Sequence, residues 1–119
     1  MGRLGEKRRE EDRMLRIYED ALAVVRELRG MMIEIARRDS DLARQLRRCG
    51  ASMVLNIAEG SYARNGNRKA LFSVALGSTK ETRACLDVAQ AFGYVGEIDD
   101  EIAERLERIG GVLYKLSQG

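Results

Sequence analysis

Apolar residues recur along the chain at alternating steps of three and four, the spacing that places side chains on one face of an α-helix. The clearest run predicts a helix over residues 13–38, and its members are Met14, Tyr18, Ala21, Val25, Leu28, Met32 and Ile35. A second line, formed by Ile17, Val24 and Met31, widens this apolar face. The residues before the run are highly charged, so we expect residues 1–12 to be a frayed N-terminal segment.

Three further runs predict helices over residues 41–59, 68–92 and 99–117. The stripe of helix 41–59 contains Leu42, Leu46, Cys49, Met53 and Asn56. The stripe of helix 68–92 contains Leu71, Val74, Ala75, Ser78, Thr82, Cys85, Ala89 and Phe92. The stripe of helix 99–117, with the residue before it, contains Ile98, Ile102, Leu106, Ile109, Leu113 and Leu116. Near the start of each of these helices stands a residue whose side chain accepts hydrogen bonds from free backbone N–H groups. In chain order these residues are Asp39 or Ser40, Asn65 or Asn67, and Asp99. We expect them to cap the helices.

Glycines are expected to end two of the helices. Gly60 follows the apolar end of the second helix, where it predicts a left-handed stop, and Gly93 ends the third. Four helices joined by short connections predict an all-α fold, an antiparallel up-and-down four-helix bundle. Residues 13–119 are expected to form this bundle as a single domain.

Two of the helices carry signs of unusually extensive contacts. Met53, Val54 and Leu55 spread apolar surface around most of the second helix, which is more than one stripe requires, so they predict an oligomer interface. The third helix is rich in small residues, and Gly77 in its middle costs about 1 kcal/mol relative to alanine. These small residues predict a neighbouring helix that packs very close.

The composition narrows the class of protein. The chain has 119 residues, of which 45% are hydrophobic and 34% charged, and it has no proline, tryptophan or histidine. Without histidine it lacks the commonest general base and metal ligand, so we expect no catalytic residues, no metal and no cofactor. No stretch resembles a signal peptide or a membrane span, and Cys49 and Cys85 lack metal-site spacing. A cytoplasmic protein with two core thiols is expected, ahead of a disulfide or a reactive pair.

Charge is uneven along the chain. The overall net charge is +2, but the segment 37–83 holds ten Lys and Arg residues against four acids, a net charge of +6. Clustered guanidinium groups suit phosphate backbones, although a solvated surface has the same composition. The candidate nucleic-acid-binding residues are Arg44, Arg47, Arg48, Arg64, Arg68 and Lys69. Only Tyr62 is aromatic among the basic loop residues, so base stacking is expected to be minor.

A polar motif closes the second predicted helix and consists of Asn56, Glu59, Gly60 and Ser61. In one interpretation Glu59 is a desolvated general base and Asn56 binds substrate. In a second, both satisfy hydrogen-bonding groups at the turn, which is the commoner role of such residues. A third pairs Glu59 with an arginine of another subunit. The run from Gly77 to Lys80 lacks the order of a phosphate-binding loop.

Several motifs between about Asp41 and Tyr94 resemble the four-helix-bundle family of bacterial ribosomal intervening-sequence proteins. They are Gln45-Leu46-Arg47-Arg48, Ser52, Leu55 to Gly60, and Val74 to Ser78 with Glu81. This family includes the accessory variability protein of diversity-generating retroelements. The resemblance implies a non-enzymatic pentameric ring whose partner is ribosomal RNA, or a retroelement reverse transcriptase with its RNA. The chain departs from the family pattern at Asn67 to Ala70 and after Glu81, and both departures raise the local positive charge.

Together with the resemblance, these observations predict a homo-oligomeric bundle that assembles as a ring, has no enzymatic activity or small-molecule substrate, and binds structured RNA or DNA through its basic middle segment. Five such segments in one ring would bind multivalently. The alternative is a protein-interaction scaffold without a nucleic-acid role, in which the arginines pair with acids across subunits. The acid-rich segment from Glu97 to Glu107 is one source of those acids.

Overall fold

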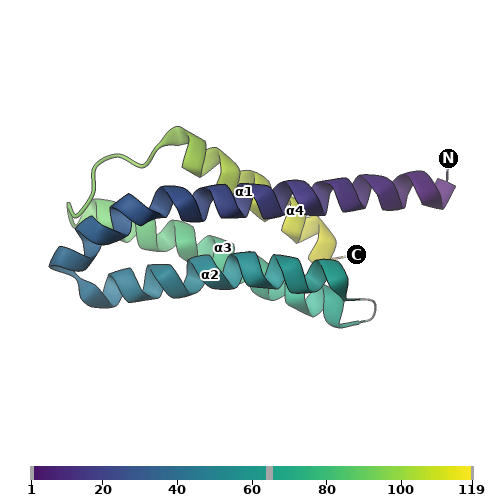
Figure 1. The fold of residues 1–119 in the computed structure, drawn as a ribbon, viewed down its shortest axis with the longest axis horizontal. Coiled ribbons are helices and arrows are strands. Elements are labelled where there is room, and N and C mark those ends of the chain that lie inside the picture. Colours follow the sequence, from purple (N-terminus) through teal and green to yellow (C-terminus); the bar gives the residue numbers. More distant parts are fainter. Residues whose placement is uncertain (1, 64–65, 119) are drawn as a thin grey trace.

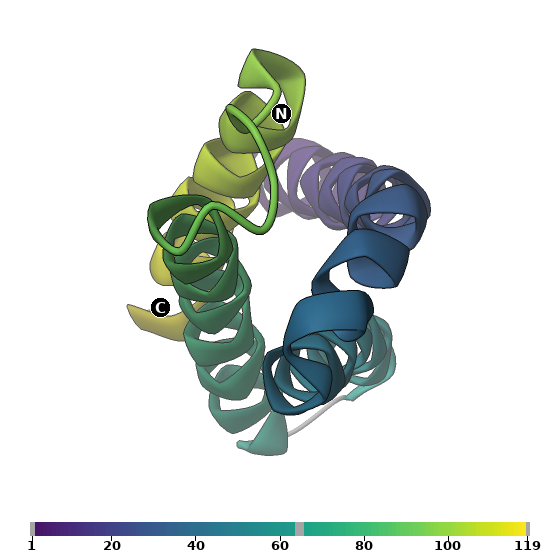
Figure 2. The same ribbon diagram turned by 90° about the vertical axis from the view of Figure 1, so that its left-hand side faces the viewer.

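The computed structural model describes residues 2–63 and 66–118 and confirms an all-α four-helix bundle. Its helices are α1 (Gly2–Arg38), α2 (Ser40–Tyr62), α3 (Asn67–Ala91) and α4 (Asp100–Gln118). Consecutive helices run antiparallel along the long axis (Figure 1). Viewed from the end, they form a four-sided arrangement in which α1 contacts α2 and α4, and α3 contacts the same two helices (Figure 2).

The structure places two helix boundaries more than one residue from the sequence prediction. α1 begins at Gly2 instead of near residue 13, because its charged start consists mainly of strong helix formers. Its N-terminal part extends past the other helices (Figure 1). α2 continues to Tyr62, three residues beyond the predicted end, so Gly60 is a helical residue without positive φ. The prediction of a left-handed stop at Gly60 was wrong.

Gly60 instead provides space for an aromatic ring. A Cβ atom added at this position would lie 2.6 Å from Cε1 and 2.8 Å from Cδ1 of Phe72, far inside normal contact distance. Phe72 belongs to α3 and is fully buried. The glycine therefore allows α2 and α3 to approach closely at this end of the bundle.

The other local signals behave as predicted. The Asp39 side chain caps α2 by accepting a hydrogen bond from the Leu42 N–H at 2.9 Å. Asp99 accepts one from the Glu101 N–H at the same distance. Gly93 follows α3 with a φ of 77°, a left-handed conformation that costs glycine nothing. The cap predicted for α3 is the exception: Gly66 precedes the helix and has no side chain, Asn67 is its first residue, and Asn65 lies outside the described residues.

The core follows the predicted stripes of α1, α2 and α4, and it includes five of the eight predicted members of the α3 stripe, which are Ala75, Ser78, Thr82, Cys85 and Ala89. Residues buried on α3 include Phe72, Thr79 and Leu86, none of which was predicted, whereas Val74 and Phe92 are 52% and 66% exposed. Apolar residues occupy both faces of this helix, so periodicity alone left its rotation open. Gly77 is also exposed and has no neighbouring atom near its Cβ position, so no helix of the same chain packs against it.

Candidate functional site

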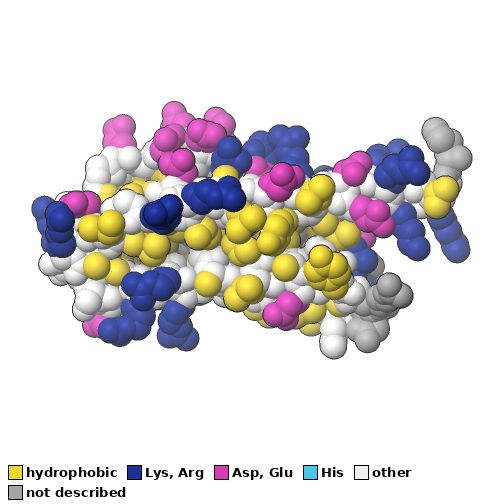
Figure 3. Space-filling model, viewed as in Figure 1, with side chains coloured by type: hydrophobic (Ala, Val, Ile, Leu, Met, Phe, Trp, Pro, Cys, Tyr) yellow, Lys and Arg dark blue, Asp and Glu magenta, His cyan; other side chains and the backbone are white. Residues whose placement is uncertain are grey.

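The N-terminal half of α2 carries a cluster of exposed arginines, here called the basic surface and defined by Arg44, Arg47 and Arg48. Arg44 Nη1 lies 3.1 Å from Asp41 Oδ1, but both side chains are more than half exposed, so this pair contributes little to stability. Within the described residues, Arg47 and Arg48 form no ion pair. Their positive charge is therefore available to an external anion. Lys and Arg side chains gather over this end of α2 in Figure 3.

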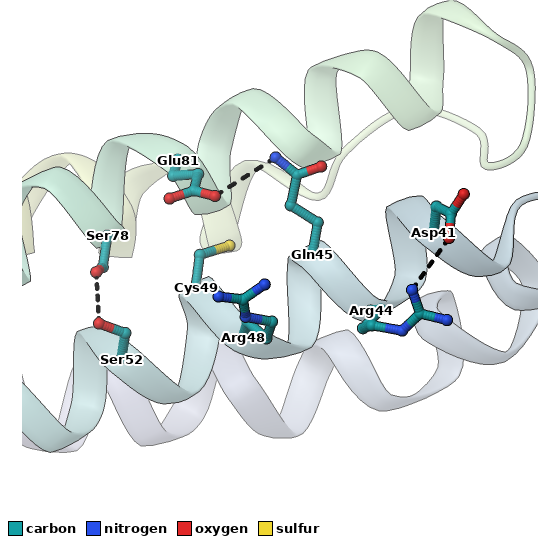
Figure 4. A pocket seen from close by; sticks show the side chains of 8 residues that line it. All are labelled: Asp41, Arg44, Gln45, Arg48, Cys49, Ser52, Ser78 and Glu81. Carbon is teal, nitrogen blue, oxygen red and sulfur yellow. Dashed lines mark hydrogen bonds and ion pairs between the residues drawn. The ribbon is translucent and has the colours of Figure 1, made fainter.

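Beside the basic surface, α2 and α3 enclose an open groove of about 560 Å³. Side chains of both helices point into it (Figure 4). The lining residues are Asp41, Arg44, Gln45, Arg48, Cys49, Ser52, Ser78 and Glu81. Five of them, at positions 45, 48, 52, 78 and 81, belong to the motifs that carry the family resemblance. The antiparallel packing of α2 on α3 thus gathers motifs that are separated in sequence into one site.

Hydrogen bonds fix one end of this groove. Ser78 Oγ donates to Ser52 Oγ at 2.7 Å, and Asn56 Nδ2 donates to the same oxygen at 3.1 Å and to the Ser52 carbonyl at 2.9 Å. Because Ser52 Oγ accepts twice, its own proton is left to donate. The Arg48 guanidinium lies on the same side of α2 (Figure 4). Ser52 and Arg48 are therefore suited to binding an anion together.

The opposite wall of the groove is acidic. Gln45 Nε2 donates to Glu81 Oε2 at 3.5 Å, which is long for a hydrogen bond. Arg48 and Glu81 line the same groove without forming an ion pair. A ligand here would meet cationic donors on α2 and a carboxylate acceptor on α3.

The floor of the groove is unreactive. Cys49 and Cys85 are buried free thiols, as expected from the sequence. The pKa of the Cys85 thiol is raised to about 12, mainly by burial and secondly by the nearby Cys49. The Thr82 hydroxyl lies 3.4 Å from Cys49 Sγ and packs beneath the groove. The two thiols therefore belong to the core.

The remaining predicted binding residues lie at the other end of the α2–α3 hairpin. Arg68 Nη2 lies 2.7 Å from Glu10 Oε1, and its guanidinium carbon lies 5.6 Å from the centre of the Phe72 ring. Arg68 therefore holds α3 against α1. Lys69 is exposed nearby, and Arg64 lies outside the described residues. The five predicted residues that the structure describes thus do not form one continuous surface.

The polar motif at the end of α2 is held by local bonds. Asn56 bonds to Ser52, and Ser61 Oγ donates to the Ile57 carbonyl at 2.8 Å. The Glu59 side chain is exposed, so it lacks the burial that a desolvated general base requires. Glu59 contributes its backbone carbonyl, which accepts from the Ala63 N–H at 3.1 Å.

The predicted oligomer interface is divided between the inside and the outside of the bundle. Met53 and Val54 are buried in the core of their own chain, whereas Leu55 is 58% exposed. The outer surface near Leu55 includes an apolar groove of about 400 Å³ between α1 and α2, where yellow side chains gather in Figure 3. The groove is lined by Glu11, Met14, Leu15, Tyr18, Ala58, Ser61 and Tyr62.

Sequence reasoning missed a buried ionic cluster between α1 and α4. Asp20 is only 4% exposed; its Oδ1 lies 2.9 Å from Arg105 Nη1, and its Oδ2 lies 2.8 Å from Arg108 Nε. Burial alone raises the pKa of Asp20, but the hydrogen bonds and charges of Arg108 and Arg105 outweigh it and lower that pKa. The available signal was the position of Asp20 between Ile17 and Val24, on the apolar face of its helix.

Two classes of site are missing from the described part of the chain. Within residues 2–63 and 66–118, no set of three or more Cys, Asp or Glu side chains is arranged to hold a metal ion. No described helix is long and apolar enough to cross a membrane.

The fold and the groove define a four-helix bundle with a mixed polar site between its second and third helices. The family model of the 23S rRNA-intervening sequence protein matches residues 5–115, so the chain belongs to that family. A crystal structure of a protein of unknown function from the S23 ribosomal protein family of Bacteroides thetaiotaomicron is similar, with a TM-score of 0.55. It is 20% identical, and the match covers 92% of each chain, so it supports the fold. No curated protein matches this chain.

Proposed function

We propose that this chain is a non-enzymatic, homo-oligomeric bundle that binds structured RNA or DNA through its basic middle segment. The observation that carries the proposal is the basic surface of α2, where Arg47 and Arg48 have no carboxylate partner among the described residues. Guanidinium groups without partners attract phosphates and can bind them in a bidentate manner. Membership of an rRNA-intervening sequence family is consistent with an RNA partner.

The charge distribution supports α2 as the main contact. Arg68 and Arg105, by contrast, are both committed to ion pairs within the chain, and Arg44 has one weak exposed pair. A retroelement reverse transcriptase with bound RNA is a second partner that this surface suits, because such a complex also presents phosphates.

Salt dependence tests this proposal. We expect the purified protein to bind RNA or DNA at low salt and to lose affinity as salt rises, with a slope of roughly 0.9 per neutralised phosphate on duplex DNA. The double variant Arg47→Gln/Arg48→Gln should reduce that slope by roughly 1–2 and weaken binding about tenfold or more. Fluorescence anisotropy at several salt concentrations measures both quantities.

The matched control is Arg16→Gln/Arg26→Gln, which removes two exposed charges from α1. It should leave the slope close to that of the wild-type protein. Equal losses in the two double variants would mean that only net charge matters. If the wild-type protein binds neither RNA nor DNA at low salt, the nucleic-acid role is wrong and the scaffold alternative is favoured.

The exposed apolar groove between α1 and α2 supports the oligomeric part of the proposal. Leu15 and Tyr62 line this groove and are 60% and 84% exposed. Leu55 is 58% exposed and lies on α2 three residues before Ala58, which also lines the groove. Contact with a second copy would remove this apolar area from water. The family resemblance implies five subunits in a ring.

Leu55→Asp tests the assembly. Because Leu55 is exposed in the subunit, the variant should remain folded but dissociate, since it places a charge in the contact between copies. Native mass spectrometry measures the subunit number and circular dichroism the folding. Ile33→Asp is the matched control, with 59% exposure on another part of α1. A monomeric wild-type protein would contradict the ring.

A further inference from the structure

Two aromatic side chains lie stacked at the end of α3. The ring centres of Phe92 and Tyr94 are 5.4 Å apart and their planes differ by 21°. Phe92 is 66% exposed, so one face of its ring rests on Tyr94 and much of the remainder is open to water. An exposed phenylalanine in a fixed orientation is unusual in a chain with 5% aromatic residues.

The backbone around this aromatic pair is tightly fixed. The Tyr94 N–H bonds to the Ala89 carbonyl and the Gly93 N–H to the Gln90 carbonyl, both at 2.9 Å. With left-handed Gly93, this is the Schellman arrangement that closes a helix. Arg38 Nη1 also donates to the Gly93 carbonyl at 2.9 Å, which ties the turn to the end of α1.

Tyr94 also lies close to Asp39, the residue that caps α2. Desolvation raises the pKa of Tyr94, and the negative charge of Asp39 raises it further. The Phe92 ring thus rests on a support fixed by the closing turn of α3 and by Arg38 of α1, so a ligand that stacks on it loses little freedom through ordering of the protein.

The aromatic pair lies at the same end of the bundle as the basic surface. Arg37 and Arg38 form the last turn of α1, and α2 begins directly after them. Phe92 follows Glu81 by three helical turns on the same face of α3, which is about 16 Å at ~1.5 Å per residue. One extended strand of nucleic acid could therefore reach both the α2–α3 groove and the Phe92 ring.

We propose that Phe92, supported by Tyr94, is a stacking surface for an unpaired nucleobase, while Arg38 and the basic surface of α2 bind the flanking phosphates. This inference rests on the proposed nucleic-acid function and adds a preference for single-stranded segments. A single open ring suits a flat base, whereas a protein partner needs an interface of roughly 800 Å² on each side. The sequence predicted only minor stacking because Tyr62 alone is aromatic among the basic loop residues and Phe92 was assigned to the apolar stripe of its helix.

The experiment compares single-stranded and blunt duplex RNA of equal length, using the full chain and fluorescence anisotropy. We expect Phe92→Leu to weaken single-strand binding roughly tenfold, because stacking on an aromatic ring is lost. The salt slope should not change, since no phosphate contact is removed. Duplex binding should stay within about twofold, and Phe92→Trp, which keeps a flat ring, should retain single-strand affinity. Wild-type protein should also quench 2-aminopurine placed in the single strand.

Each other outcome has a defined meaning. Full single-strand affinity and full quenching in Phe92→Leu would overturn the stacking surface, as would an equal loss for duplex and single strand. An altered subunit mass with unchanged RNA binding would assign Phe92 to a protein contact instead. In all three cases the proposed function would stand, because the wild-type protein still binds. Failure of the wild-type protein to bind any RNA or DNA would overturn both proposals.

Discussion

The α1–α4 and α2–α3 sides of the bundle both contain arginines and carboxylates, but they arrange these groups in opposite ways. Between α1 and α4, Asp20 meets Arg105 and Arg108 in short, nearly buried ion pairs. Between α2 and α3, Arg48 and Glu81 line one groove without pairing. Charges that satisfy each other hold a fold together, whereas charges left apart in a groove are available to a ligand. The comparison separates the structural arginines from the candidate binding arginines.

The largest expected effect concerns the packing of α2 against α3 at Gly60. Gly60→Ala should destabilise the protein by about 2–3 kcal/mol, because its Cβ would overlap the buried ring of Phe72. Urea denaturation measures the change. Gly77→Ala is the control, since nothing lies near its Cβ position; it should be neutral or stabilise by up to about 1 kcal/mol. Equal effects of the two variants would show that α2 and α3 are not packed around Gly60.

A smaller effect is expected on the α1–α4 side. Asp20→Asn should cost about 1–2 kcal/mol, because it leaves two arginines without their anion. The cost stays below that of a fully buried pair, since the side chains of Arg105 and Arg108 are 28% and 39% exposed. Asp87→Asn removes the exposed partner of Arg83 and should change stability by less than about 0.5 kcal/mol.

The same variant has a defined pH dependence. The pKa of Asp20 is lowered in the folded state, so its contribution to stability is present above the ordinary carboxyl pKa of 3.8 and is lost as pH falls through the lowered value. The stability difference between wild type and Asp20→Asn should therefore be constant near neutral pH and shrink below about pH 4. A difference that persists unchanged in acid would mean that Asp20 acts through packing and not through charge.

Local signals made most of the fold predictable. Asp39, Asp99 and Gly93 act through their own backbone neighbours, so sequence alone located those helix ends. Gly60 was misassigned because its role depends on Phe72, a residue of the next helix.

The candidate site depended more strongly on tertiary structure. The arginines of α2 were identified from local charge, and Ser52 and Glu81 from the family motifs. Their meeting in one groove required the pairing of α2 with α3. The stacking of Phe92 near Arg38 required the turn at Gly93, which brings residues 55 positions apart into contact. Long-range contacts of this kind are invisible to helical periodicity.

The unequal lengths of the helices affect how the number of subunits can be counted. α1 has 37 residues and α4 has 19, and the chain measures 52 × 25 × 19 Å. An elongated particle diffuses more slowly than a sphere of equal mass, so a gel-filtration column overestimates the size of a single 13.4 kDa chain. The number of subunits is therefore best determined from the measured mass of the particle, while its hydrodynamic radius reports how the elongated subunits are arranged.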